Sequence, residues 1–198
     1  MATAHDETIK ELQDAAIAAG IHYDIWWALK SKDTRPKYID VMNRYVTYFR
    51  ASISAHFVAM LVALYRLYET RKDTHNFPTL LDRLEADGSL PKVDIDSLRA
   101  QHARAKPLWV KVSILRNEVF GHRSLDLDTS AAFVKASVTG DELKELVDIT
   151  KAMLNELTLK LRDSTHAFNV SGTRDTMAIL EALRLQTASA LTNRSSGT

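Results

Sequence analysis

The sequence of 198 residues contains no cysteine, only six glycines and only four prolines. The absence of cysteine excludes disulfides, zinc sites with thiolate ligands and cysteine nucleophiles, and it fits a reducing cytoplasm. The scarcity of glycine and proline means few turns, and no segment shows the period-2 alternation of a half-buried strand. Most segments have apolar residues at helical spacing, which predicts an all-α fold.

The sequence also lacks a strong charge imbalance and a recognisable targeting signal. The formal net charge of +1 argues against a protein that coats nucleic acid through its overall charge, although it leaves room for a local basic patch. The N-terminal stretch MATAHDETIKELQD is polar and acidic, unlike a signal peptide. The longest apolar run, from Phe57 to Tyr65, is too short to span a membrane. We therefore expect a soluble, cytoplasmic protein without a membrane partner.

Apolar periodicity and capping signals together predict the helices. Asn76 and Gly88 have the residue types that begin and end a short helix, and Thr139 with Glu142 forms a capping-box pattern. Pro107 should kink or split the helix that contains it. The expected helices span about residues 6–30, 36–72, 77–87, 96–122, 140–163 and 173–191, with a loop over residues 123–132.

These helices are expected to form an antiparallel bundle, because short connections favour antiparallel neighbours. We assign the bundle of four to five helices to residues 1–165. Residues 166–198 are expected to form a C-terminal helical extension that ends in a flexible tail.

The helix expected to end at His122 carries unusual polar residues into its last turn, in the stretch VSILRNEVFGHRSLDLD (residues 112–128). On an ideal α-helix, Arg116 and His122 flank Val119 by about 60° on either side and lie about 9 Å apart along the axis. Both side chains can then serve one groove, whereas Asn117 would join them only after a local distortion. The alternative is that His122 is a hydrogen-bonded core residue, the commoner role of a lone histidine on an apolar face.

Basic residues gather around this stretch. Between Leu98 and Arg123, six basic residues and one acidic residue give the segment a formal charge of +5. Such a local field would attract the phosphates of RNA, and we take Arg104, Lys111 and Arg123 as candidate RNA contacts. Charge runs are more often a solvated face than a binding site, so that interpretation stays open.

The phrase LRNEVFGHR resembles the signature of the HEPN superfamily: an arginine, a polar residue, several intervening positions and a histidine. The residues of this motif, together with the tyrosine-rich second helix, look most like those of the abortive-infection, phage-resistance branch of the superfamily. The resemblance implies that Arg116, Asn117 and His122 are catalytic residues. A second arginine–histidine pair, Arg50 and His56, lacks the polar neighbour, and we discount it.

What the resemblance implies about function is specific. Members of the superfamily are often metal-independent ribonucleases that need no cofactor, act as homodimers, and serve as toxins or in phage defence. An antitoxin partner is therefore possible for this chain. In one toxin group a tyrosine two places after the histidine is modified by a partner enzyme; Ser124 occupies that place here, which puts that regulation in doubt.

The residue types suit RNA cleavage without a metal. A base must take the 2′-hydroxyl proton and an acid must protonate the leaving 5′-oxygen, and histidine can do either because its pKa lies near 6.5. The arginine fork can hold the phosphate and stabilise its developing charge. Each chain offers one suitable histidine, so two chains related by a two-fold axis would be needed to supply both groups. The expected product is a 2′,3′-cyclic phosphate with a 5′-hydroxyl.

Several other interpretations are weaker or stay open. His122, Asp126 and Asp128 could bind a metal, but a solvated turn is favoured, and we expect no metal site. Trp26 and Trp27 could stack bases, although core or interface packing is more common for such residues. A non-catalytic helical module that binds RNA or a partner protein is the main alternative function. A structural dimeric bundle with an accidental motif is the second.

Overall fold

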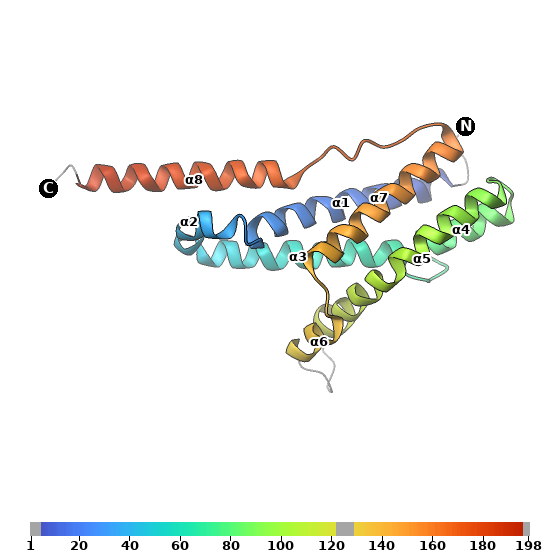
Figure 1. Ribbon diagram of the computed structural model, residues 1–198, viewed down its shortest axis with the longest axis horizontal. Helices are drawn as coiled ribbons and strands as arrows, with labels where there is room; N and C mark the ends of the chain where they lie inside the picture. Colours follow the sequence, from blue (N-terminus) through green and yellow to red (C-terminus); the bar gives the residue numbers. More distant parts are fainter. Residues whose placement is uncertain (1–4, 122–128, 196–198) are drawn as a thin grey trace. The chain divides into compact units, whose positions relative to one another are not determined.

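The computed structural model describes residues 5–121 and 129–195 (Figure 1), and every regular element within them is a helix. The all-α prediction is therefore confirmed. In chain order the elements are α1 (Asp6–Lys30), the 3₁₀ helix η1 (Arg35–Tyr38), α2 (Ile39–Arg44), α3 (Val46–Tyr68), α4 (Phe77–Ala86), α5 (Lys92–Leu115), the π-helix η2 (Arg116–Gly121), α6 (Thr129–Ala136), α7 (Gly140–Arg162) and α8 (Gly172–Ser195).

The chain divides into two compact units. Unit 1 comprises Met1–Ala19 and Val58–Asn169, and unit 2 comprises Gly20–Phe57 and Val170–Thr198. Helices α1 and α3 each supply residues to both units. The expected division of the chain into residues 1–165 and 166–198 stays a prediction.

Unit 1 is built around helix α5, which contacts α4, α6 and α7. The apolar spacing of residues 140–163 predicts one inward face for α7, and that face is buried over almost its whole length: Leu143, Leu146, Val147, Ile149, Thr150, Met153, Leu154 and Leu157. Opposite residues of α3 close the core, and the hydroxyl of Tyr68 lies 2.7 Å from that of Thr150. Burial raises the pKa of Tyr68, which keeps this phenol neutral and fixed in the core.

The caps of α4 and α7 are those that the sequence predicts. The Asn76 side chain accepts a hydrogen bond from Thr79 N at 2.8 Å, and Gly88 follows α4 with a φ of +69°. Thr139 and Glu142 form both hydrogen bonds of a capping box at the start of α7. Side-chain oxygens thereby satisfy backbone N–H groups that have no partner inside the helix.

Pro107 neither splits nor ends its helix, because α5 runs continuously from Lys92 to Leu115. A proline removes one hydrogen bond to the carbonyl four residues earlier. Both Ala103 and Pro107 are exposed, so water can bond the freed carbonyl. The predicted loop over residues 123–132 is also partly wrong, because α6 begins at Thr129. This short helix packs against α5 and η2, contacts that local sequence does not reveal.

Unit 2 corrects the prediction of one unbroken helix over residues 36–72. Tyr45 has φ −117° and ψ 42°, which separates α2 from α3. The apolar spacing of residues 36–72 includes Tyr45 and predicts that it faces the core, but Tyr45 is 39% exposed. The buried cluster of unit 2 draws residues from α1, η1, α2, α3 and α8: Leu29, Tyr38, Val41, Met42, Phe49 and Leu180.

Among the residues described, α3 is long and apolar enough to cross a bilayer by length and composition alone. A single helix of this kind is weak evidence for a membrane, because core helices of soluble proteins pass the same test. Met60, Leu61 and Leu64 are fully buried in the core of unit 1. Their burial accounts for the apolar character of the C-terminal part of α3 without a membrane.

Candidate functional site

The predicted catalytic arginine lies where the backbone changes its hydrogen-bonding pattern. Helix α5 ends at Leu115, and residues Arg116–Gly121 form a π-helix with i→i+5 bonds. His122 lies outside the described residues, so its place relative to Arg116 stays a prediction, but the α-helical construction does not apply from Arg116 to Gly121. It assumed about 100° per residue, whereas a π turn contains more residues. Single π turns inside α-helices occur frequently at functional sites.

Arg116 is held from two sides. Its Nη1 donates to Oδ1 of Asn117 at 2.9 Å, and its guanidinium carbon lies 4.6 Å from the ring centroid of Tyr65 in α3. The side chain is half-buried. A cation over an aromatic face is attracted by the ring quadrupole, so Tyr65 supports the guanidinium without using any of its N–H donors.

Tyr65 is itself packed against α5. Its ring centroid lies 6.0 Å from that of Trp109, and both side chains are half-buried. The Nε1 of Trp109 is buried and has no hydrogen-bond partner within the described part of the chain. Leaving such a donor unpaired costs about 1–3 kcal/mol. Arg116, Tyr65 and Trp109 are therefore neighbours in sequence of contact, with the cation at one end and the unpaired Trp109 Nε1 at the other.

Glu118, the acidic residue of the π-helix, connects this helix to α6. Glu118 is half-buried, and its carboxylate lies 3.6 Å from Nζ of Lys135. Glu118 also lies four residues before His122 and could pair with a charged imidazole there, but His122 lies outside the described residues. Lys135 supplies a counter-charge from α6, which packs on η2.

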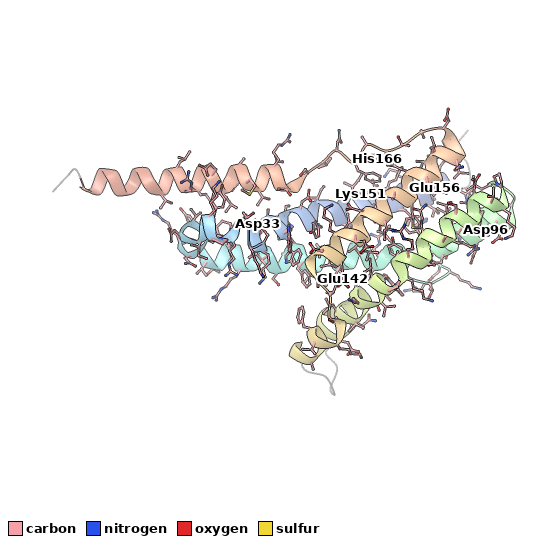
Figure 2. All side chains as sticks on the ribbon, viewed as in Figure 1. Asp33, Asp96, Glu142, Lys151, Glu156 and His166 are labelled. Atoms are coloured by element: carbon pink, nitrogen blue, oxygen red, sulfur yellow. The ribbon has the colours of Figure 1, made fainter. Side chains whose placement is uncertain are left out.

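The candidate RNA contact Lys111 faces α7. Its ammonium group pairs with the carboxylate of Glu142 and donates to the carbonyl of Ser137 at 3.0 Å. Glu142 also closes the capping box, and it lies at the first turn of α7 (Figure 2). Lys111 and the capping box together hold the pKa of this carboxyl below its ordinary value. In this arrangement Lys111 ties α5 to the beginning of α7.

Arg104, the second candidate RNA contact, is exposed and lines a shallow groove of about 430 Å³ between α5 and α7. The α7 side of that groove carries Asp141, Lys144, Glu145 and Asp148. The structure therefore brings Arg116 and Asn117 together, pairs Lys111 with Glu142 of α7, and places Arg104 in a groove that α7 lines with three acidic residues and one lysine.

The basic field of residues 98–123 is weaker than the sequence count implies. Arg99 pairs with Asp82 at 2.9 Å and with Glu85 at 2.7 Å, both carboxylates coming from α4. Lys111 pairs with Glu142. Two of the six cations are thus neutralised by other helices, and Arg116 is the one fixed next to the motif asparagine.

Several predicted residues lie outside the described residues. These are His122, Arg123, Ser124, Asp126 and Asp128. The alternative metal site of His122 with the two aspartates therefore stays untested. Within residues 5–121 and 129–195, no group of three or more histidines and carboxylates is placed to hold a metal ion.

Trp26 and Trp27 belong to an aromatic cluster of unit 2. The ring centroid of Trp26 lies 5.2 Å from that of Phe57, and Trp27 stacks on Tyr23 at 6.2 Å. This is the packing role that the sequence favoured over base stacking. His56 is not a core residue, because it is half-buried and bonded to His22.

Sequence reasoning missed Tyr65 and Lys135. Tyr65 looked like the end of an apolar run in the core helix, and nothing local links it to Arg116. Lys135 lay next to the expected loop. The position of Tyr65 at the polar edge of an apolar helix face is the sequence signal that could have suggested a contact with a charged residue.

Comparisons with known proteins address the whole chain. Residues 2–181 match the model of a HEPN family described as AbiU2. Comparison with curated proteins and with solved structures gives no match. The matched range contains every helix from α1 to α7 and only the first part of α8, up to residue 181.

Proposed function

The chain belongs to the AbiU2 family, an abortive-infection-associated family of the HEPN superfamily, and we propose that it is a metal-independent endoribonuclease. Arg116, Asn117 and His122 are its catalytic residues, as the motif resemblance implies. The single observation that carries this proposal is the fixation of Arg116 at a π turn, between Asn117 and the face of Tyr65.

The geometry of Arg116 suits a phosphate clamp. One guanidinium N–H is used by Asn117, and the guanidinium carbon lies over the ring of Tyr65. A guanidinium has five N–H donors in its plane, so further donors stay available for phosphate oxygens. Because the cation is held before RNA binds, less conformational entropy is lost when it engages the transition state.

The acid–base work falls to His122. One imidazole can deprotonate the 2′-hydroxyl or protonate the leaving 5′-oxygen, and a second imidazole improves the reaction by doing the other task. We therefore propose a homodimer in which two copies of the motif face one phosphodiester. The protein acts on RNA in the cytoplasm, in phage defence or as a toxin that an antitoxin restrains.

The test is RNA cleavage in the presence of a chelator, with end-group analysis of the fragments. Wild type should give 2′,3′-cyclic phosphate and 5′-hydroxyl ends. Arg116→Ala should lower the cleavage rate by about 10²–10³-fold, and His122→Ala by about 10²–10⁴-fold. Arg83→Ala is the matched control, because Arg83 is an exposed arginine of unit 1 with no role in the motif. Cleavage that survives both motif substitutions would refute the catalytic assignment.

Two further measurements separate the rival functions. Light scattering at the assay concentration should give the mass of a dimer, and a monomer would contradict the composite site. RNA affinity measured by fluorescence anisotropy tests the non-catalytic alternative. A wild-type protein that binds RNA but never cleaves it, and loses affinity as Arg116→Ala, would be a binding module.

A further inference from the structure

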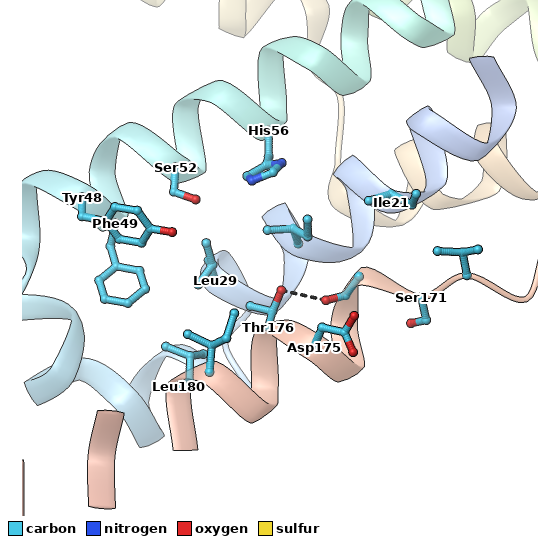
Figure 3. A pocket seen from close by; sticks show the side chains of 14 residues that line it. Ile21, Leu29, Tyr48, Phe49, Ser52, His56, Ser171, Asp175, Thr176 and Leu180 are labelled. Atoms are coloured by element: carbon cyan, nitrogen blue, oxygen red, sulfur yellow. Dashed lines mark hydrogen bonds between the residues drawn. The ribbon is translucent and has the colours of Figure 1, made fainter. Parts of the chain in front are cut away.

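Unit 2 contains a pocket formed by α1, α3 and the beginning of α8 (Figure 3). Its volume is about 240 Å³. An engineered apolar cavity of about 150 Å³ is enough to bind benzene, so this pocket can hold one ring with a short side chain. The apolar part of the wall is formed by Ile21, Ile25, Leu29, Phe49, Ile179 and Leu180.

The α3 wall of the pocket carries polar side chains at regular spacing. Tyr48, Ser52 and His56 are four residues apart along α3, and such residues share one face of a helix. In Figure 3 they form a row along α3, on the side that faces α1 and α8. Two hydroxyls and an imidazole therefore offer hydrogen bonds to anything that enters.

His56 is oriented by a second histidine. Its Nδ1 lies 2.9 Å from Nδ1 of His22 in α1, so one imidazole donates to the other. Burial lowers the pKa of both rings, and the neighbouring His56 lowers the pKa of His22 further. Both shifts favour the neutral rings, and because Nδ1 of His56 is used in this contact, its Nε2 is left for other hydrogen bonds.

The α8 wall is anchored to α1. Ser171 Oγ and Gly172 N donate to Oδ2 of Asp24 at 3.0 and 3.1 Å. A Cβ on Gly172 would lie 2.7 Å from Cγ1 of Ile25, so only glycine permits this close approach. The same first turn places Asp175 at the pocket, with its side chain 71% exposed.

We propose that this pocket binds a small molecule with an apolar body, such as an aromatic ring, and a cationic amine head. The apolar wall would take the body, and the carboxylate of Asp175 would face the head. Asp175 is at present paired with Arg174 at 3.2 Å, but both groups are exposed, so an amine can replace that weak contact. An anionic head would meet Asp175 with no cation among the lining residues.

The test uses three probes of matched shape: 2-phenylethylamine, 2-phenylethanol and phenylacetate. Binding to the full chain is followed by ligand-observed NMR and by titration of protein amide signals. The amine should bind about three- to fivefold more tightly than the alcohol, the size expected for an exposed ion pair. Phenylacetate should bind more weakly than both.

Two variants locate the site. Ser52→Leu fills the pocket and should abolish binding of the amine and the alcohol. Asp175→Asn should remove the preference for the amine and leave alcohol binding unchanged, whereas Asp33→Asn, at an exposed aspartate of unit 2 outside the pocket, should change neither. The proposal fails if the amine does not bind, if the alcohol binds equally well, or if folded Ser52→Leu still binds both. Because RNA cleavage is not measured, this outcome is independent of the ribonuclease assignment.

Discussion

The guanidinium of Arg116 lies over the ring of Tyr65, with 4.6 Å between its carbon and the ring centroid. This contact joins the π-helix at the end of α5 to the core helix α3 within unit 1. Within residues 5–121 and 129–195 the printed contacts of Arg116 are with Asn117 and Tyr65, so in this part of the chain the cation is held by an amide and an aromatic ring. An acidic partner would compete with a phosphate for the arginine, whereas an aromatic face does not.

If Tyr65 positions Arg116, its effect depends on the ring and not on the hydroxyl. Tyr65→Phe should retain RNA cleavage close to wild type. Tyr65→Leu should lower kcat about two- to fivefold, corresponding to a cation–π contact of about 0.5–1 kcal/mol. Single-turnover kinetics at saturating RNA checks this, with thermal unfolding as a control for folding. Equal rates for the two variants would contradict the positioning role.

The Lys111–Glu142 pair offers a test of whether Lys111 binds RNA. Lys111 is occupied by Glu142 and by the Ser137 carbonyl. If Lys111 also contacts RNA, Glu142→Gln should raise RNA affinity by freeing the ammonium group, and Lys111→Ala should lower it. If the pair is only structural, both substitutions should lower the unfolding free energy and leave RNA affinity unchanged. Anisotropy titrations beside chemical denaturation distinguish the two results.

Stability of the chain should fall in mild acid. The pKa of His22 and that of His56 are lowered in the folded state, chiefly by burial, and burial also lowers the pKa of His102 in unit 1. As pH falls below about 6.5, the unfolded chain binds protons that the folded chain does not, so the free energy of unfolding decreases.

The histidine pair can be separated from other titrating groups by substitution. The double variant His22→Asn, His56→Asn should have a flatter stability profile than wild type between about pH 6.5 and the lowered pKa values. His166→Asn is a suitable control, because His166 is a half-buried histidine outside the pair. A profile as steep in the double variant as in wild type would show that the pair does not titrate as described.

Asn76 combines two structural tasks. Its Oδ1 caps α4, and its Nδ2 donates to the carbonyl of Arg71 at 2.7 Å. Asn76→Ala should lower the free energy of unfolding by about 1–2 kcal/mol. Asn76→Ser keeps a capping oxygen and should cost less. Asn43→Ala, at an exposed asparagine, should stay within about 0.5 kcal/mol of wild type in urea denaturation.

Two glycines should respond to alanine for different reasons. At Gly172 the added Cβ would lie 2.8 Å from the Ile21 carbonyl oxygen, a backbone atom that cannot move cheaply. We expect Gly172→Ala to cost about 1–3 kcal/mol. Gly88→Ala has open space, but its φ of +69° strains any L residue, at about 1–2 kcal/mol. Crystal structures of the variants should show backbone displacement at residue 172 and none at residue 88.

Local signals in the sequence predicted those parts of the fold that depend on neighbouring residues. The first helix, the Asn76 and Gly88 caps, the Thr139–Glu142 capping box and the buried stripe of α7 all follow from residue types at fixed spacing. These interactions are formed within one or two helical turns. The family assignment also followed from a local motif, because the arginine–asparagine–histidine spacing lies within a single segment.

Features that depend on distant residues were not predictable. The break at Tyr45 interrupts a continuous apolar pattern, and helix propensity gave no reason to expect it. The pairing of Arg99 with α4 and of Lys111 with α7 reduces a charge that a linear count overestimates. Tyr65 and Arg116 are far apart in the chain, and only packing brings them together.

The π turn at Arg116–Gly121 has a consequence for protein engineering. Its hydrogen bonds join residues five apart, whereas those of α5 join residues four apart. The π turn therefore holds one extra residue while the chain remains helical. Removing one residue from this turn would let α5 continue with ordinary α-helical bonds. Side chains beyond the deletion would then turn by about 100° around the axis. Indel scanning through this turn would therefore reorient side chains while it preserves most of the surrounding sequence.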